Sequence, residues 1–379
     1  MDPISMSSST PDSTPGLSRH AVGQFNEHFN EGIKLYHAGQ FAESAARLGA
    51  AVRLRSDWAE AHWYLACALR ESGNAEAAMQ ACRRAIEINS RLAQAHEALA
   101  GLLCSAGDLD TAEKEWVQAI ALDPKFAHAY MGLGWVCKRR GDLDGCIREM
   151  RRAVEAEPGS IEASLALGES LLEKGEIAGA IRAYEASVQI DPGSLQAQIG
   201  LAGANYVAGN LEAALRGFRE ALCIDRGSVI ARHNLGLALV DSGRLDDAIA
   251  EFQQVLETAP EFAVSHSGLG HALQSKGLAE SALTEFQEAL RLNPDDALTH
   301  FAAGMTLVDL DRMYEAISRL REAMRLVPDN SAFRLALGMA LLEVGEDKEG
   351  VGELKWVIAK GTPEEAREAR QIMLEAGLV

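Results

Sequence analysis

The chain has 379 residues, of which 47% are hydrophobic and 24% are charged, so its composition is that of a folded protein. Its 36 Lys and Arg residues are outnumbered by 55 Asp and Glu residues, which gives a net charge of −19. Nucleic acid and anionic membranes attract basic surfaces, so this charge disfavours both as partners. No apolar run of about 18 residues predicts membrane insertion. The six cysteines lack the CxxC spacing of a zinc ribbon and suit a reducing compartment, so we expect a cytoplasmic protein.

The N-terminal segment, residues 1–24, is predicted to be a tail and lead-in. Residues 1–18 are rich in Ser, Thr and Pro and have little apolar content. Such a segment cannot bury enough apolar surface to fold, so we expect it to be disordered.

A spacing of 34 residues dominates the rest of the chain, residues 25–364, which divides into ten consecutive repeats. Nine of the ten repeats carry glycine at position 15, counting Phe25 as position 1: Gly39, Gly73, Gly107, Gly141, Gly175, Gly209, Gly243, Gly277 and Gly345. The remaining slot holds Asp311, which predicts a slightly altered turn because Asp adopts the left-handed conformation less readily.

Other columns of the repeat predict two helices in each unit. Position 8 is always Gly or Ala, position 20 is always small, and position 24 is mostly bulky, as in Trp116 and Phe252. Small residues would let two helix backbones approach, and the bulky residue would fill the space between pairs. Glycine at position 15 ends the first helix, and proline at position 32, as in Pro124 and Pro260, ends the second.

These columns resemble the tetratricopeptide repeat family. Leu133 and Gly134 fill positions 7 and 8, Gly141 fills position 15, Phe218 fills position 24 and Pro260 fills position 32. The resemblance covers about nine-tenths of the chain. It implies an all-α, right-handed superhelical α-solenoid of antiparallel helix pairs, in which the first helix of each pair lines a concave groove.

A further helix is predicted after the last repeat, within residues 362–379. Thr362 serves as N-cap, Pro363 occupies the first helical position and Glu365 completes a capping box. The apolar face that follows is expected to cover the edge of the last repeat as a C-terminal capping helix.

No catalytic motif, cofactor motif or metal-binding motif is evident, so we expect no enzyme activity and no cofactor. Histidine recurs at position 4, where the family often has tryptophan. Because this position falls at the packed junction between helices, we interpret the column as structural: His28, His62, His96, His266 and His300.

By resemblance, positions 2, 5, 6, 9, 12 and 13 face the ligand in each repeat. Six polar or aromatic residues at these positions form a candidate partner-binding set: Trp63, Arg70, His128, Trp135, Lys138 and Arg139. Lys138 and Arg139 belong to repeat 4 (residues 127–160), the one repeat with a positive net charge, so an acidic peptide could dock there.

Later repeats carry a second candidate set, which is apolar: Leu237, Val240, Leu298, Phe301, Met305, Val308, Leu335, Met339 and Leu342. So many apolar residues on a solvent-facing surface have three possible explanations. An amphipathic partner helix could bind in the groove, or a second copy or the chain's own end could cover these residues. Alternatively, the ligand-facing positions of the late repeats are shifted by one residue.

Five ligand-facing positions are glycine: Gly101, Gly132, Gly200, Gly203 and Gly268. Glycine within a helix costs about 1 kcal/mol relative to alanine, so backbone access for a ligand and tighter curvature are competing explanations.

These observations predict a non-catalytic scaffold that binds a protein or peptide segment in its groove. Two alternatives remain open, namely a self-assembling homo-oligomeric solenoid and the regulatory subunit of a separately encoded enzyme.

Overall fold

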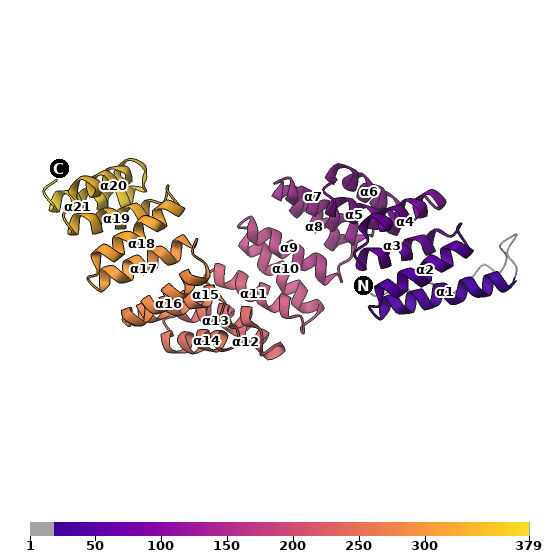
Figure 1. Cartoon of the computed structure of the whole chain (residues 1–379), viewed down its shortest axis with the longest axis horizontal. Helices are drawn as coiled ribbons and strands as arrows, with labels where there is room; N and C mark the ends of the chain where they lie inside the picture. Colours follow the sequence, from indigo (N-terminus) through magenta and orange to yellow (C-terminus); the bar gives the residue numbers. More distant parts are fainter. Residues whose placement is uncertain (1–18, 379) are drawn as a thin grey trace. The chain divides into compact units, whose positions relative to one another are not determined.

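The computed structural model describes residues 19–378, which contain helices and no strand. The predicted disordered tail, residues 1–18, lies outside the described residues. Successive helices form antiparallel pairs joined by short turns (Figure 1), which confirms the predicted all-α solenoid of helix pairs. The chain divides into two compact parts, residues 1–190 and 191–379, which are taken separately below.

The described residues of the N-terminal part, from residue 19 onwards, form ten helices: α1 (Arg19–His37), α2 (Phe41–Leu54), α3 (Ala59–Glu71), α4 (Ala75–Ile88), α5 (Ala93–Ser105), α6 (Leu109–Leu122), α7 (Ala127–Arg139), α8 (Leu143–Ala156), α9 (Ile161–Glu173) and α10 (Ile177–Ile190). The C-terminal part contains the others: α11 (Leu195–Val207), α12 (Leu211–Ile224), α13 (Val229–Asp241), α14 (Leu245–Thr258), α15 (Ala263–Ser275), α16 (Ala279–Leu292), α17 (Ala297–Asp309), α18 (Met313–Leu326), α19 (Ser331–Glu343), α20 (Asp347–Lys360) and α21 (Pro363–Glu375). Within residues 19–378, no helix is both long and apolar enough to cross a membrane.

The turn inside each pair depends on a residue in the left-handed region. Gly141 has a φ of 78°, and Asp311 has a φ of 59° at the equivalent position. Asp311 N donates to Val308 O at 2.9 Å, just as Gly141 N donates to Lys138 O at 3.0 Å. The change in this turn is limited to a smaller φ, because the same backbone hydrogen bond closes it.

Replacing Asp311 with glycine should stabilise the protein by about 1 kcal/mol, since glycine adopts a positive φ without the steric cost borne by other residues. Urea unfolding followed by circular dichroism measures the change. The reciprocal control, Gly345→Asp, places aspartate at the same turn of the last pair, where φ is 81°, and should lower stability by a similar amount. Equal midpoints for all three proteins would contradict the strain at Asp311.

Close approach between paired helices requires the small residue at position 8. A Cβ added at Gly236 on α13 would lie 2.7 Å from the Phe252 ring on α14, and one added at Gly270 would lie 2.6 Å from the Phe286 ring. Both rings are fully buried. The predicted combination of a small residue on the first helix and a bulky residue on the second is confirmed.

Helix α21 covers the apolar end of the C-terminal part. Thr362 and Glu365 form the predicted capping box at its start. Ala369 and Met373 on its inner face are buried in one cluster with Leu354 of α20. The last pair thus has an apolar neighbour on both sides.

Candidate functional site

A pocket of about 360 Å³ lies on the first helices of two adjacent pairs, α5 and α7. The lining residues come from α5, α6 and α7: Glu97, Gly101, Cys104, Ser105, Trp116, His128, Met131, Gly132, Trp135 and Arg139. All except Trp116 occupy positions 2, 5, 6, 9, 12 or 13 of their repeats. We call this the α5–α7 pocket.

Two glycines shape the α5–α7 pocket for different reasons. A Cβ at Gly132 would lie 2.2 Å from Cε2 of Trp116, so glycine lets the indole fit against the α7 backbone. No atom lies within 4 Å of a Cβ placed at Gly101, so the α5 backbone borders open space there. Gly268 resembles Gly132, because its Cβ would meet the Phe252 ring at 2.7 Å, and Gly203 resembles Gly101. Ring packing is therefore an explanation that the sequence did not suggest.

One indole at the pocket is buried and the other is exposed. Trp116 is 5% exposed, and its Nε1 has no hydrogen-bond partner among the described residues. Trp135 is 53% exposed, and the guanidinium carbon of Arg139 lies 5.9 Å from its ring centroid. An exposed indole with a cation over its face offers a large surface for contact with a ligand.

Glu97 brings a carboxylate into this apolar pocket. Burial raises the pKa of the Glu97 carboxyl, while the charges of Arg70 and His128 act in the opposite direction. Arg70 is itself bound to Glu71, with its Nε 3.0 Å from Oε1. Glu97 is half-buried, and among the described residues no group donates a hydrogen bond to its side chain.

Most cations of repeat 4 are already neutralised by neighbouring carboxylates. Five of the six form ion pairs: Lys138 with Glu173 at 2.5 Å, Arg140 with Asp110 at 2.6 Å and Glu113 at 2.7 Å, Arg148 and Arg152 each with Glu149 at 3.1 Å, and Arg151 with Glu176 at 3.5 Å. Arg139 has no carboxylate within 4 Å in residues 19–378. The predicted basic surface thus provides one unpaired cation, at the α5–α7 pocket.

The predicted polar set is only partly brought together. His128, Trp135 and Arg139 line the pocket, and Arg70 acts electrostatically on its Glu97. Lys138 is exposed, but its ammonium is bound to Glu173. Trp63 is half-buried and lies against Tyr64, with ring centroids 4.5 Å apart.

The predicted apolar set is less accessible than expected. Leu298 is 66% exposed and Met339 is 44% exposed, whereas Leu335 is buried in the cluster beneath α21. The others are half-buried against their neighbours: Leu237, Val240, Phe301, Met305, Val308 and Leu342. Adjacent helices therefore bury much of the apolar surface that we predicted from the sequence to contact a ligand.

Residues at position 4 link each pair to the preceding one. His266 Nε2 donates to Pro260 O at 3.0 Å, and its Nδ1 lies 2.7 Å from Oε2 of Glu285. The same bond to the carbonyl six residues earlier recurs in other repeats: His62 to Ser56, His96 to Ser90, Tyr130 to Pro124, Arg232 to Arg226, His300 to Pro294 and Arg334 to Pro328. These bonds give the histidine column a structural role.

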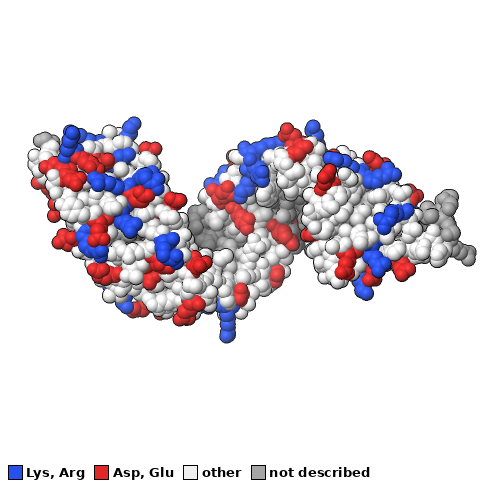
Figure 2. Space-filling view, in the orientation of Figure 1, with Lys and Arg blue, Asp and Glu red and all other residues white. Residues whose placement is uncertain are grey.

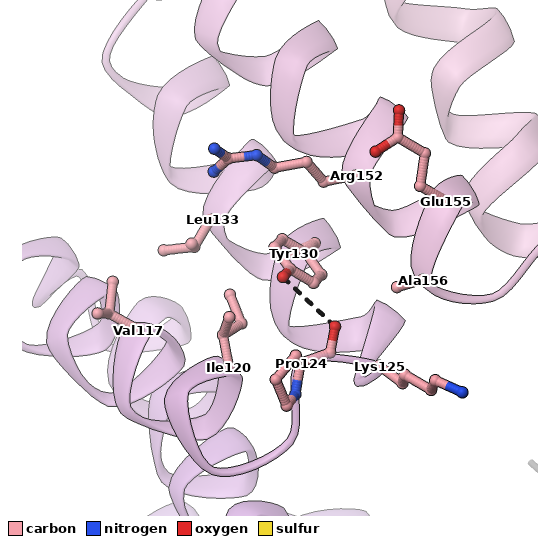
Figure 3. Close-up of a pocket in the computed structure, with 9 residues that line it drawn as sticks. All are labelled: Val117, Ile120, Pro124, Lys125, Tyr130, Leu133, Arg152, Glu155 and Ala156. Carbon is pink, nitrogen blue, oxygen red and sulfur yellow. Dashed lines mark hydrogen bonds between the residues drawn. The ribbon is translucent and has the colours of Figure 1, made fainter.

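A larger pocket of about 580 Å³ lies at the junction between α6, α7 and α8, and we call it the outer pocket because its lining includes the second helices α6 and α8. Figure 3 shows Tyr130 at its centre, donating to Pro124 O at 3.4 Å, with Val117 and Ile120 on one side and Arg152 on another. Because Tyr130 is the position 4 residue, this pocket follows the seam at which one pair joins the next.

Clusters of metal ligands and reactive cysteines are two features of many catalytic sites. No cluster of three or more His, Cys, Asp or Glu residues could hold a metal ion in residues 19–378. Burial raises the pKa of the Cys67 and Cys82 thiols to about 12, so neither is a ready nucleophile.

Acidic and basic side chains are interspersed on the face that Figure 2 shows.

Comparison with known proteins identifies the family. A tetratricopeptide repeat model matches residues 29–93, 97–161, 139–194 and 233–297, more than half of the chain, and a second such model matches residues 171–235. The chain belongs to the tetratricopeptide repeat family. No curated protein sequence matches it.

Several solved structures resemble this tetratricopeptide repeat protein. MamA is 28% identical over 45% of this chain and 93% of MamA, with a TM-score of 0.40. A tetratricopeptide repeat protein from Parabacteroides merdae is 15% identical over 65% of this chain and 98% of its own, with a TM-score of 0.54. A chain of the APC/C hetero-tetramer Cut9-Hcn1 is 14% identical over 94% of this chain and 91% of its own, with a TM-score of 0.53. At such identities the latter two support the fold alone.

Proposed function

We propose that this tetratricopeptide repeat protein is a non-catalytic interaction scaffold that binds a segment of a partner protein on the face formed by the first helices of its pairs. The α5–α7 pocket carries the proposal, because nine of its ten lining residues occupy the ligand-facing positions of the repeat. We also propose that α1–α20 correspond to ten repeats over residues 25–364 and that α21 is their cap.

In the N-terminal part, we assign contact with the partner to Trp63, Arg70, His128, Trp135, Lys138 and Arg139. Trp135 and Arg139 are the strongest of these, since both are exposed and neither is bound to a carboxylate among the described residues. Arg139 would bind a carboxylate of the partner. In the C-terminal part, Leu298 and Met339 are the accessible members of the apolar set and would contact apolar side chains.

Trp135→Ala should weaken binding of a partner segment at least tenfold, because exposed aromatic anchors carry much of the binding energy at protein interfaces. An array of synthetic peptides identifies binders of the parent protein, and fluorescence polarisation gives the dissociation constant for each variant.

Val117→Ala is the matched control, since Val117 is equally exposed at 53% but lines the outer pocket of Figure 3. The proposal predicts unchanged binding for this control. Peptides whose dissociation constant changes with Val117→Ala but not with Trp135→Ala would instead place the interaction at the outer pocket.

A further inference from the structure

Glu97 and Arg139 give the α5–α7 pocket two charges that the protein leaves unpaired. Both residues line the pocket. They form no ion pair with each other, which means that their charged groups lie more than 4 Å apart. The acid lies in a half-buried position on α5, and the cation lies over the exposed Trp135 ring on α7. A ligand that fits this pocket therefore meets a negative group and a positive group at separate points.

The described residues around Glu97 donate no hydrogen bond to its half-buried carboxylate. Arg70, whose charge acts on Glu97, directs its Nε and Nη2 to Glu71 Oε1, at 3.0 Å and 2.9 Å. His128 acts on Glu97 through its charge but donates no hydrogen bond to it. A carboxylate that is partly withdrawn from water and has no protein donor is stabilised when a cationic donor of a ligand binds to it.

We propose, building on the scaffold function above, that the α5–α7 pocket binds a basic side chain, lysine or arginine, of the partner segment and pairs its charge with Glu97. The aliphatic stem of such a side chain packs on indole surface, and its charged end is attracted to an indole face. Arg139 over Trp135 already shows this geometry within the protein, at 5.9 Å. An acidic side chain at the same depth would meet Glu97 as a like charge.

The bare α5 backbone at Gly101 leaves room for the incoming side chain, since no atom lies within 4 Å of a Cβ placed there. The pocket volume of about 360 Å³ is within the range of about 300–1,000 Å³ that is usual for ligand pockets. Arg139 at the other end of the pocket then favours an acidic residue elsewhere in the same segment. The proposed ligand is thus a segment with a basic residue for Glu97 and a carboxylate for Arg139.

The experiment uses sets of blocked synthetic peptides that are identical except for one central residue: arginine, its neutral isostere citrulline, or glutamate. The full chain is titrated by fluorescence polarisation, and we expect arginine peptides to bind at least tenfold more tightly than their citrulline counterparts. Glu97→Gln keeps the shape of the side chain and should abolish this preference. Arg139→Gln should preserve the preference for arginine over citrulline, while the loss of its pairing with the carboxylate of the segment weakens the binding of both peptides alike.

Glu113→Gln is the matched control, since Glu113 is a surface acid bound to Arg140 outside the pocket, and it should leave the preference unchanged. Equal binding of arginine and citrulline peptides, or preference for glutamate, would overturn the role of Glu97 while leaving the scaffold function in place if binding still requires Trp135. Absence of any Trp135-dependent binder would overturn the scaffold function itself, and the role of Glu97 with it.

Discussion

Phe252→Ala should destabilise the protein by about 3–5 kcal/mol, the usual cost of emptying a fully buried aromatic site. The Phe252 ring is fully buried between two glycines, Gly236 on α13 and Gly268 on α15, and a Cβ at either would lie 2.7 Å from it. Because neither glycine has a side chain that could move into the space, the cavity would stay open and the cost would be at the upper end of this range.

The loss should be concentrated around α14, since each repeat contacts mainly its neighbours. Hydrogen exchange measures this directly, and we expect amides of α13–α15 to lose the most protection. Leu278→Ala, at the 45% exposed N-cap position before α16, is the control and should change stability by less than about 0.5 kcal/mol. Uniform loss of protection over both parts of the chain would contradict coupling through neighbours.

The repeat columns predict the fold well because the same local physics recurs ten times. Glycine at position 15 specifies a left-handed turn, and the small residue at position 8 specifies contact with the bulky residue of the paired helix. Asp311 shows the limit of that reasoning, because its turn is fixed by backbone hydrogen bonds that the identity of one side chain does not reveal.

The candidate site is less predictable because accessibility depends on neighbouring repeats. Position 5 holds both Glu97 and Leu335, but one lines a pocket while the other is buried beneath α21. Likewise, Lys138 is neutralised by Glu173 of the next repeat, whereas Arg139 beside it is not. The sequence places all four on the ligand-facing side of their helices, and only packing distinguishes them.

A recurring sequence signal could have revealed the role of position 4. The histidines from the second repeat onwards, like Tyr130 and Arg334, can donate a hydrogen bond, and each lies eight residues after the end of the preceding second helix and six after a loop carbonyl. A donor at constant distance from a loop carbonyl indicates a bond between pairs. The need for a hydrogen-bond donor explains why position 4 holds histidine, tyrosine or arginine in different repeats, whereas a metal site would not explain arginine there.

Gly132→Ala and Gly101→Ala should change stability in opposite directions, although both replace a glycine within a first helix. Alanine normally stabilises a helix interior by about 1 kcal/mol, and Gly101→Ala should gain that amount because no atom lies within 4 Å of the new methyl group. Gly132→Ala should instead cost about 2–3 kcal/mol, since its methyl group would lie 2.2 Å from the buried Trp116 ring, which overpacks the site.

Urea unfolding of the two variants measures the stabilities, and the indole Nε1–H resonance of Trp116 reports whether the ring is displaced. If Gly132→Ala lowers stability and shifts this resonance, position 132 must be glycine because the Trp116 ring packs against it. Stabilisation by both substitutions would mean that the ring moves aside at little cost. Glycine at Gly132 would then be explained by access for a ligand, and alanine there should weaken binding in the α5–α7 pocket while leaving the fold more stable.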